Sequence, residues 1–244
     1  MHISIVAEKI FGIGGWPVTN SLLLSVVALL ILLSLAVFIK RKASIIPGKL
    51  QSIFELFLEE LLSLMDSVLG SRALSERYLP LIATIFLSIM LSNWLGLFPG
   101  VGSIGLLEGA EGFRPLLRAP AADLNFTIAL AIISVLSVNI LGVGAIGFIK
   151  HFHKYFNFSN PLHFFTGILE FISEFVKIIS FSFRLFGNVF AGEVLLTIVA
   201  FLVPYFLPLP FLFLEVFVGF IQAFIFSMLT LVFVALAVQE EPAH

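Results

Sequence analysis

An arginine, an asparagine and a glutamate interrupt a strongly apolar stretch, SFSFRLFGNVFAGE, at residues 180–193. Arg184 matters most, because placing an arginine at membrane depth costs about 2.5 to 3.5 kcal/mol on insertion scales. A guanidinium stays charged at any physiological pH, whereas a buried lysine can lose its proton. We therefore expect Arg184 to act as a fixed cation that attracts ionised carboxylates and hinders a proton from passing.

Arg184 belongs to a polar stripe on a predicted helix. At about 100° per residue, five residues share one face: Glu170, Glu174, Lys177, Arg184 and Asn188. The first three lie near the helix start, where a solvated and mutually paired cluster is expected. No acidic residue occurs at positions 180, 181, 187 or 188, so Arg184 has no acidic neighbour on its own helix face. Two alternatives remain: an ion pair with a more distant carboxylate of this chain, or a partner outside it.

Three further polar residues lie in the last apolar third of the chain. Glu193 is nine residues beyond Arg184 and therefore on the opposite helix face. Glu215 and Gln222 are one heptad apart. Because ionisable residues inside a span face protein or an aqueous cavity, Glu193 and Glu215 are candidates to line a water-filled path for protons. The alternative for Glu215 is a position at the outer membrane interface.

The composition places these residues in a membrane. Of 244 residues, 60% are hydrophobic and 11% are charged. A bilayer core of about 30 Å needs about 20 apolar residues per helix. The chain is therefore predicted to be an all-α integral membrane protein, a single membrane domain over residues 1–244 with about five crossings. The absence of cysteine excludes disulfides and thiolate metal ligands, and we expect no metal, no cofactor and no nucleic-acid partner.

Three upright spans are predicted, at residues 21–39, 79–98 and 124–149. Basic clusters, KRK at 40–42 and KHFHK at 150–154, follow the first and third spans. The positive-inside rule places both clusters in the cytoplasm and the N-terminus outside.

An amphipathic helix along the membrane surface is predicted over residues 47–70. Its apolar residues recur at three- and four-residue spacing, and its polar face carries Glu55, Glu59, Glu60 and Asp66. A helix held only by anionic lipid usually shows lysine and arginine instead. The acidic face therefore either meets a protein partner or is simply solvated.

The last third of the chain is predicted to form a long helical hairpin. A single helix over residues 161–203 would be about 64 Å long at 1.5 Å per residue, roughly twice the bilayer core. We therefore expect a strongly tilted helix over 161–203, paired with a second long helix over 210–238 that leads to a cytoplasmic C-terminus. The alternative is a break at Gly187 and Asn188 into two upright spans.

FRLFGNVFAGE at 183–193 and QAFIF at 222–226 closely resemble subunit a of the F-type ATP synthase, as do ADLN at 122–125 and LSNWLGLFP at 91–99. The resemblance implies a tilted final hairpin and a role as the stator half of a proton channel. It also implies that Arg184 faces the carboxylates of the rotating c-ring, with the ion path marked by Asn188, Glu193 and Gln222.

The resemblance also implies partners and shows one departure. The acidic face of the 47–70 helix would meet subunit b of the peripheral stalk. Family members often hold a glutamate and a histidine at the positions of Glu193 and Glu215, whereas here both are glutamates. Two close carboxylates would titrate as a coupled pair.

We interpret the chain as the stator subunit of a rotary ATP synthase, with two offset half-channels that pass protons to and from c-ring carboxylates. It would be no enzyme by itself, and it has no GxxxxGK[ST] nucleotide loop. The expected location is an energy-transducing membrane, the bacterial inner membrane, in contact with lipid. The alternatives are an autonomous proton-coupled transporter that uses Arg184 for an anionic substrate, and a membrane scaffold whose polar residues only join helices.

Overall fold

The computed structural model describes residues 7–102, 104–108, 112–153, 155 and 161–238. Five of its helices are long and apolar enough to cross a membrane: α1 (Asn20–Lys42), α3 (Arg72–Gly96), α4 (Leu124–Ile146), α6 (Pro161–Leu202) and α7 (Pro208–Val238). The prediction of an all-α membrane protein with about five such helices is confirmed. The N-terminus, the end of the KHFHK cluster at residue 154 and the predicted cytoplasmic C-terminus lie outside the described residues.

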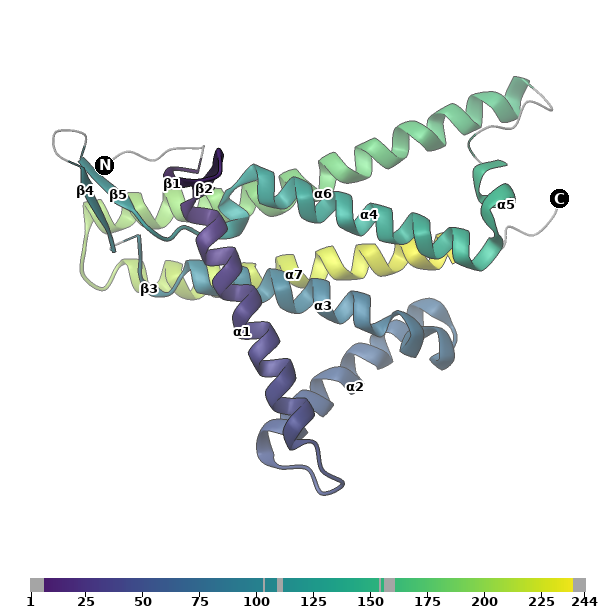
Figure 1. The fold of residues 1–244 in the computed structure, drawn as a ribbon, viewed down its shortest axis with the longest axis horizontal. Helices are drawn as coiled ribbons and strands as arrows, with labels where there is room; N and C mark the ends of the chain where they lie inside the picture. The colour runs from purple at the N-terminus through teal and green to yellow at the C-terminus, as the bar shows by residue number, and fades with distance from the viewer. Residues whose placement is uncertain (1–6, 103, 109–111, 154, 156–160, 239–244) are drawn as a thin grey trace.

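Helices α3, α4, α6 and α7 lie side by side in an elongated bundle (Figure 1). Its core is apolar, with Ile82 and Leu231 fully buried where α3 meets α7 and with Phe181 against Phe226, ring centroids 4.7 Å apart, where α6 meets α7. Two buried hydroxyl pairs also join helices, Ser134 with Thr230 at 2.8 Å and Thr127 with Ser182 at 3.1 Å. Such polar contacts stabilise helix pairs where the hydrophobic effect is weak.

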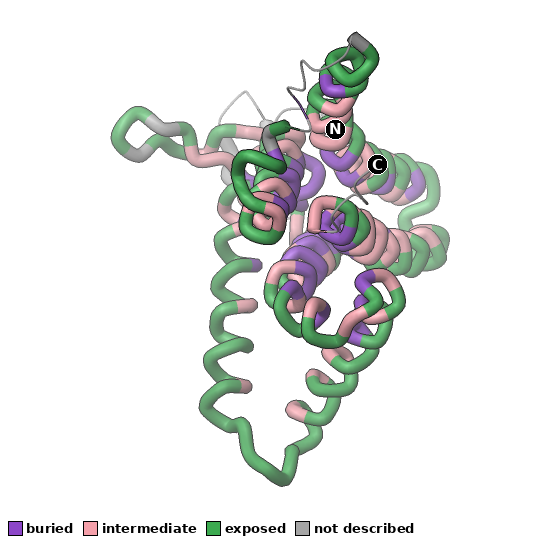
Figure 2. Tube along the Cα trace, turned by 90° about the vertical axis from the view of Figure 1, so that its right-hand side faces the viewer, coloured by how far each residue is buried: buried purple, intermediate pink, exposed green. Residues whose placement is uncertain are grey.

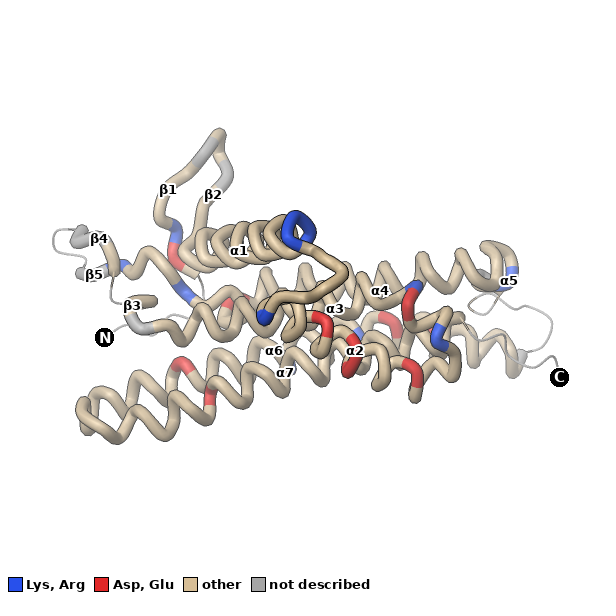
Figure 3. Tube along the Cα trace, turned by 90° about the horizontal axis from the view of Figure 1, so that it is seen from below, with Lys and Arg blue, Asp and Glu red and all other residues tan. Residues whose placement is uncertain are grey.

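Helix α1 leaves the bundle, and α2 (Lys49–Leu69) returns to it, so that the two form a V on one side (Figure 1). Most of α1 and the elbow are exposed in Figure 2, while buried residues gather where the bundle helices meet. Helix α2 is amphipathic as expected: Leu61 and Met65 are buried against the bundle, whereas Glu55 and Glu59 are exposed. Acidic residues recur along α2 in Figure 3, while most of α6 and α7 is uncharged.

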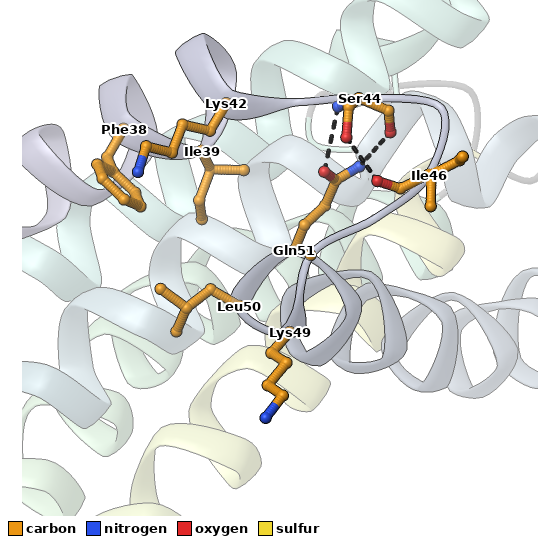
Figure 4. Close-up of a pocket in the computed structure, with 9 residues that line it drawn as sticks. Phe38, Ile39, Lys42, Ser44, Ile46, Lys49, Leu50 and Gln51 are labelled. Atoms are coloured by element: carbon orange, nitrogen blue, oxygen red, sulfur yellow. Dashed lines mark hydrogen bonds between the residues drawn. The ribbon is translucent and has the colours of Figure 1, made fainter.

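The elbow between α1 and α2 is held by one side chain (Figure 4). The amide of Gln51 donates to the carbonyl of Ser44 at 3.0 Å, and the N–H of Ser44 donates to Gln51 Oε1 at 3.2 Å. These contacts border an open pocket of about 450 Å³ whose lining includes Phe38, Lys42 and Lys49.

The hairpin helices α6 and α7 are each continuous. Gly187 and Asn188 are helical, so the break considered there is not observed. A short turn joins the two helices and includes Phe206 at φ 63°. The tilt of this hairpin in a bilayer stays a prediction.

Several boundaries differ from those expected. Helix α3 begins at Arg72 rather than at residue 79, because Pro80 is accommodated inside the helix instead of marking its start. Helix α4 ends at Ile146 rather than 149, at Gly147 with φ 90°, and a short helix, α5 (Phe148–His153), follows. The other helices begin and end within three residues of the predicted positions.

Small strands also occur outside the helices. Strand β1 (Lys9–Ile13) pairs with β2 (Trp16–Thr19), and β4 (Gly105–Glu108) pairs with β5 (Gly112–Pro115), both antiparallel. A further extended segment, β3 (Pro99–Gly102), precedes them. A 3-10 turn, η2 (Pro120–Ala122), packs against α1, α3, α4 and α6. The described residues between 99 and 122 thus include a hairpin and a buried turn.

Candidate functional site

Arg184 lies on a face of α6 that the described part of the chain leaves partly open. Its neighbours on the helix, Phe181 and Leu185, are buried in the core, whereas Ser180 and Asn188 are exposed. The guanidinium donates to Ser180 Oγ at 3.2 Å, and the amide of Asn188 donates to the carbonyl of Arg184 at 2.9 Å. None of the ion pairs among the described residues includes Arg184.

The open face of α6 combines this cation with small and apolar residues. Ser180, Gly187, Asn188 and Ala191 are exposed on the same side as Arg184, at helical spacing. Phe183, adjacent in sequence, is also exposed. Small residues in such a stripe let another helix approach closely in a membrane. A cation in this position favours a protein partner over lipid.

Glu193 forms an ion pair that sequence reasoning missed. Nη2 of Arg118 lies 3.3 Å from Glu193 Oε2, and Nε of Arg118 lies 3.4 Å from the same oxygen. Arg118 is only 7% exposed, and the Glu193 side chain is 37% exposed. The signal in the sequence was a single arginine beside the ADLN motif, but nothing in helical spacing connects it to a residue 75 positions away.

Glu215 of α7 meets the α6 backbone beside Glu193. A methyl group added to Gly192 would overlap the Glu215 carboxylate, so the glycine leaves space for that side chain. The structure therefore brings Glu193, Glu215 and Arg118 to one end of the hairpin. Arg184 is nine residues from Glu193, about 13 Å along the helix axis at 1.5 Å per residue.

Gln222 is positioned by the register of the hairpin. Gly192 lies against Glu215, and Phe181 lies against Phe226, so the antiparallel register places Gln222 level with Leu185, the neighbour of Arg184. Gln222 is 8% exposed and its neighbour Ala223 belongs to the core. Along α7, the polar residues thus run from the carboxylate end toward the level of Arg184.

Helix α3 fixes α7 between these two levels. The amide of Asn93 donates to the carbonyl of Gly219 at 3.1 Å, and the indole N–H of Trp94 donates to the carbonyl of Val216 at 3.1 Å. A methyl group on Gly219 would lie 3.1 Å from Asn93 Cβ, which shows how closely the helices approach. The contact of Trp94 with α7 joins residues 122 positions apart, and sequence reasoning did not foresee it.

A second polar cluster lies toward the other end of α6. Glu174 pairs with Lys177 at 2.7 Å and also accepts from Asn139 at 3.3 Å and from the hydroxyl of Tyr155 at 3.4 Å. The predicted pairing is observed, but the pair is mostly covered: its side chains are only 18% and 22% exposed. Burial raises the pKa of Tyr155, and the charge of Glu174 adds to that increase.

These features define a multi-pass membrane protein whose last two helices carry an arginine on an open face and, at one end, two neighbouring carboxylates. A family model described as ATP synthase A chain matches residues 22–235. Three relatives are each described as ATP synthase subunit a. That of Moorella thermoacetica is 34% identical over 93% of this chain and 94% of its own, that of Campylobacter jejuni 35% over 88% of each, and that of Campylobacter concisus 36% over 86% and 85%.

The chain belongs to the ATP synthase A chain family. It is a multi-pass component of the membrane sector of an ATP synthase, in an energy-transducing membrane, with a non-catalytic role in proton transport.

Proposed function

We propose that this chain is the stator subunit that forms two offset half-channels and passes protons to and from the carboxylates of a rotating c-ring. The observation that carries the proposal is Arg184, a cation on an open helix face with no acidic partner among the described residues. An ionised ring carboxylate arriving from one half-channel would supply the missing anion. It would have to be protonated before it could leave for the lipid.

The open face of α6 suits a ring helix. Ser180, Gly187 and Ala191, which are exposed on the same side of the helix as Arg184, are small, which allows the close approach that a guanidinium and a carboxylate need. Asn188 extends the polar surface by one helical turn and holds the carbonyl of Arg184. Since each elementary charge moved through 100 mV releases about 2.3 kcal/mol, successive protonations could drive rotation.

Glu193 and Glu215 are proposed to begin the outer half-channel. They lie about two and a half helical turns from Arg184, and Gln222 is level with the arginine's neighbour Leu185. Protons entering at the carboxylates would pass Gln222 and reach the ring on one side of Arg184. The cluster of Glu174 and Lys177, at the other end of α6, is suited to the opposite half-channel.

The acidic face of α2 is proposed to bind subunit b of the peripheral stalk. Glu55 and Glu59 are exposed there, four residues apart on the helix. Reversing both charges to lysine should lower the amount of subunit b that copurifies with the chain. Equal recovery of subunit b would contradict this part of the proposal.

Orientation and source complete the proposal. The basic residues Lys40, Arg41 and Lys42 end α1 and are exposed. By the positive-inside rule they lie in the cytoplasm, with the N-terminus outside and the C-terminus inside. The membrane would be a bacterial inner membrane, with lipid covering the apolar length of α1.

The test is ATP-driven proton pumping by the reconstituted complex. Arg184→Ala should abolish pumping, while Arg77→Ala, which removes an exposed arginine on α3, should leave it nearly unchanged. Intact pumping in the Arg184 variant would contradict the proposal and favour a scaffold role. Sustained solute uptake by the purified chain alone in liposomes would favour an autonomous transporter instead.

A further inference from the structure

Arg118 is the best-buried cation near the proposed outer half-channel. It lies outside the membrane-crossing helices, two residues before η2, and yet it is only 7% exposed. Nε and Nη2 of Arg118 both donate to a single oxygen of Glu193, Oε2. Removing a guanidinium from water costs free energy, and the groups that pair with it offset that cost.

The segment that carries Arg118 is held firmly by three helices. Ala119 packs so closely on Gly96 of α3 that a methyl group there would overlap its Cβ. Asp123 accepts a hydrogen bond from Ser21 Oγ of α1 at 2.6 Å and another from the N–H of Asn125 of α4 at 3.0 Å. The alanines of η2 between these points are completely buried. Arg118 therefore projects from a fixed platform.

The two glutamates at this end of the hairpin have different surroundings. Glu193 Oε2 accepts from Arg118, and no described residue donates to Oε1. Glu215 has no ion pair or hydrogen bond among the described residues and rests against Gly192. Among the described residues Arg118 thus pairs with Glu193, and Glu215 forms no ion pair.

We propose that Arg118 is a positioning residue that holds Glu193 in an ion pair, so that Glu215 is the carboxyl group that carries the proton through the entry. The proposal rests on the function proposed above. Glu215 takes a proton from water on the outer side and becomes neutral. It then gives the same proton to water or to a ring carboxylate farther along the path and returns to its anionic form. Glu193 stays paired with Arg118 while the proton passes.

The division of roles can be tested by a double-mutant cycle in the reconstituted complex, read out as ATP-driven proton pumping. Arg118→Gln and Glu193→Gln should each lower pumping by about tenfold or more, because each leaves one charge without its partner. The double variant should pump at least about threefold faster than either single variant, since it removes both charges together. Arg118→Lys should restore part of the activity that Arg118→Gln loses.

Glu215→Gln is the matched variant, because it removes the proposed proton carrier with the same chemical change. Its loss of pumping should not be relieved by adding Arg118→Gln. The assignment would be overturned if the double variant of Arg118 and Glu193 pumps no faster than the single variants. It would also be overturned if adding Arg118→Gln restores pumping equally in the Glu215 and Glu193 variants. If Arg118→Gln prevents assembly, the pumping rates of Arg118→Lys and Glu193→Gln decide instead. Wild-type pumping in both of these variants would contradict the proposal.

Failure of this inference is distinguishable from failure of the proposed function. If Arg184→Ala abolishes pumping while the Arg118 cycle shows no coupling, only the roles of the two glutamates are wrong. If Arg184→Ala pumps normally, the half-channel account itself fails.

Discussion

Alanine in place of Gly192 would test whether contact with the α6 backbone positions Glu215. The added methyl group would overlap the end of that side chain, the Cδ atom and both oxygens. The carboxylate must then move by roughly 1 Å, and a displacement of that size can cost about 100-fold where a reaction depends on positioned groups. Because the atoms that move end a flexible side chain, we expect the fold and the assembly to be retained.

The assay is dye-monitored proton pumping in vesicles that hold the complete complex. Gly192→Ala should lower the pumping rate by about tenfold or more, with unchanged subunit content. Gly144→Ala is the matched control, because a methyl group there would meet no atom within 4 Å. Pumping at the wild-type rate in the Gly192 variant would refute the claim that Glu215 must occupy this position.

Three further predictions concern other parts of the chain. Gly96→Ala would place a methyl group against Ala119, 3.0 Å from its Cα atom. Overpacking of this kind costs about 1 to 3 kcal/mol, so the temperature of thermal denaturation and the pumping rate should both fall. Unchanged thermal stability would argue against the fixed platform. Arg184→Lys should pump far less than wild type, because an ammonium can release its proton in a buried site; wild-type pumping would show that any cation suffices. Burial raises the pKa of Tyr155, so its phenol should stay protonated above pH 10, about where an unfolded tyrosine ionises, and the stability contributed at this site should fall as pH rises through that range. Absorbance titration with and without Tyr155→Phe checks this, and a normal titration of Tyr155 would contradict it.

Features that depend on local sequence were predictable. Hydrophobic length indicated the crossing helices, and three- and four-residue spacing indicated the amphipathic α2. The lack of an acidic neighbour for Arg184 followed from the residues one turn away, and no described residue of the chain supplies one. In each case the deciding residues lie within a few positions of one another.

Features that depend on distant residues were not predictable. Arg118 reaches Glu193 only because η2 packs among four helices, which no periodicity records. The contacts of Asn93 and Trp94 with α7 arise in the same way. The start of α3 was misplaced because Pro80, usually a helix breaker, is accommodated inside the helix. The strands were missed because they are only four or five residues long.

The most direct test of the central claim is a density map of the assembled complex at Arg184. The account predicts that the guanidinium faces a carboxylate of the ring, within reach of a direct or water-bridged hydrogen bond. A map in which Arg184 is bound to a glutamate of its own chain and turned away from the ring would contradict it.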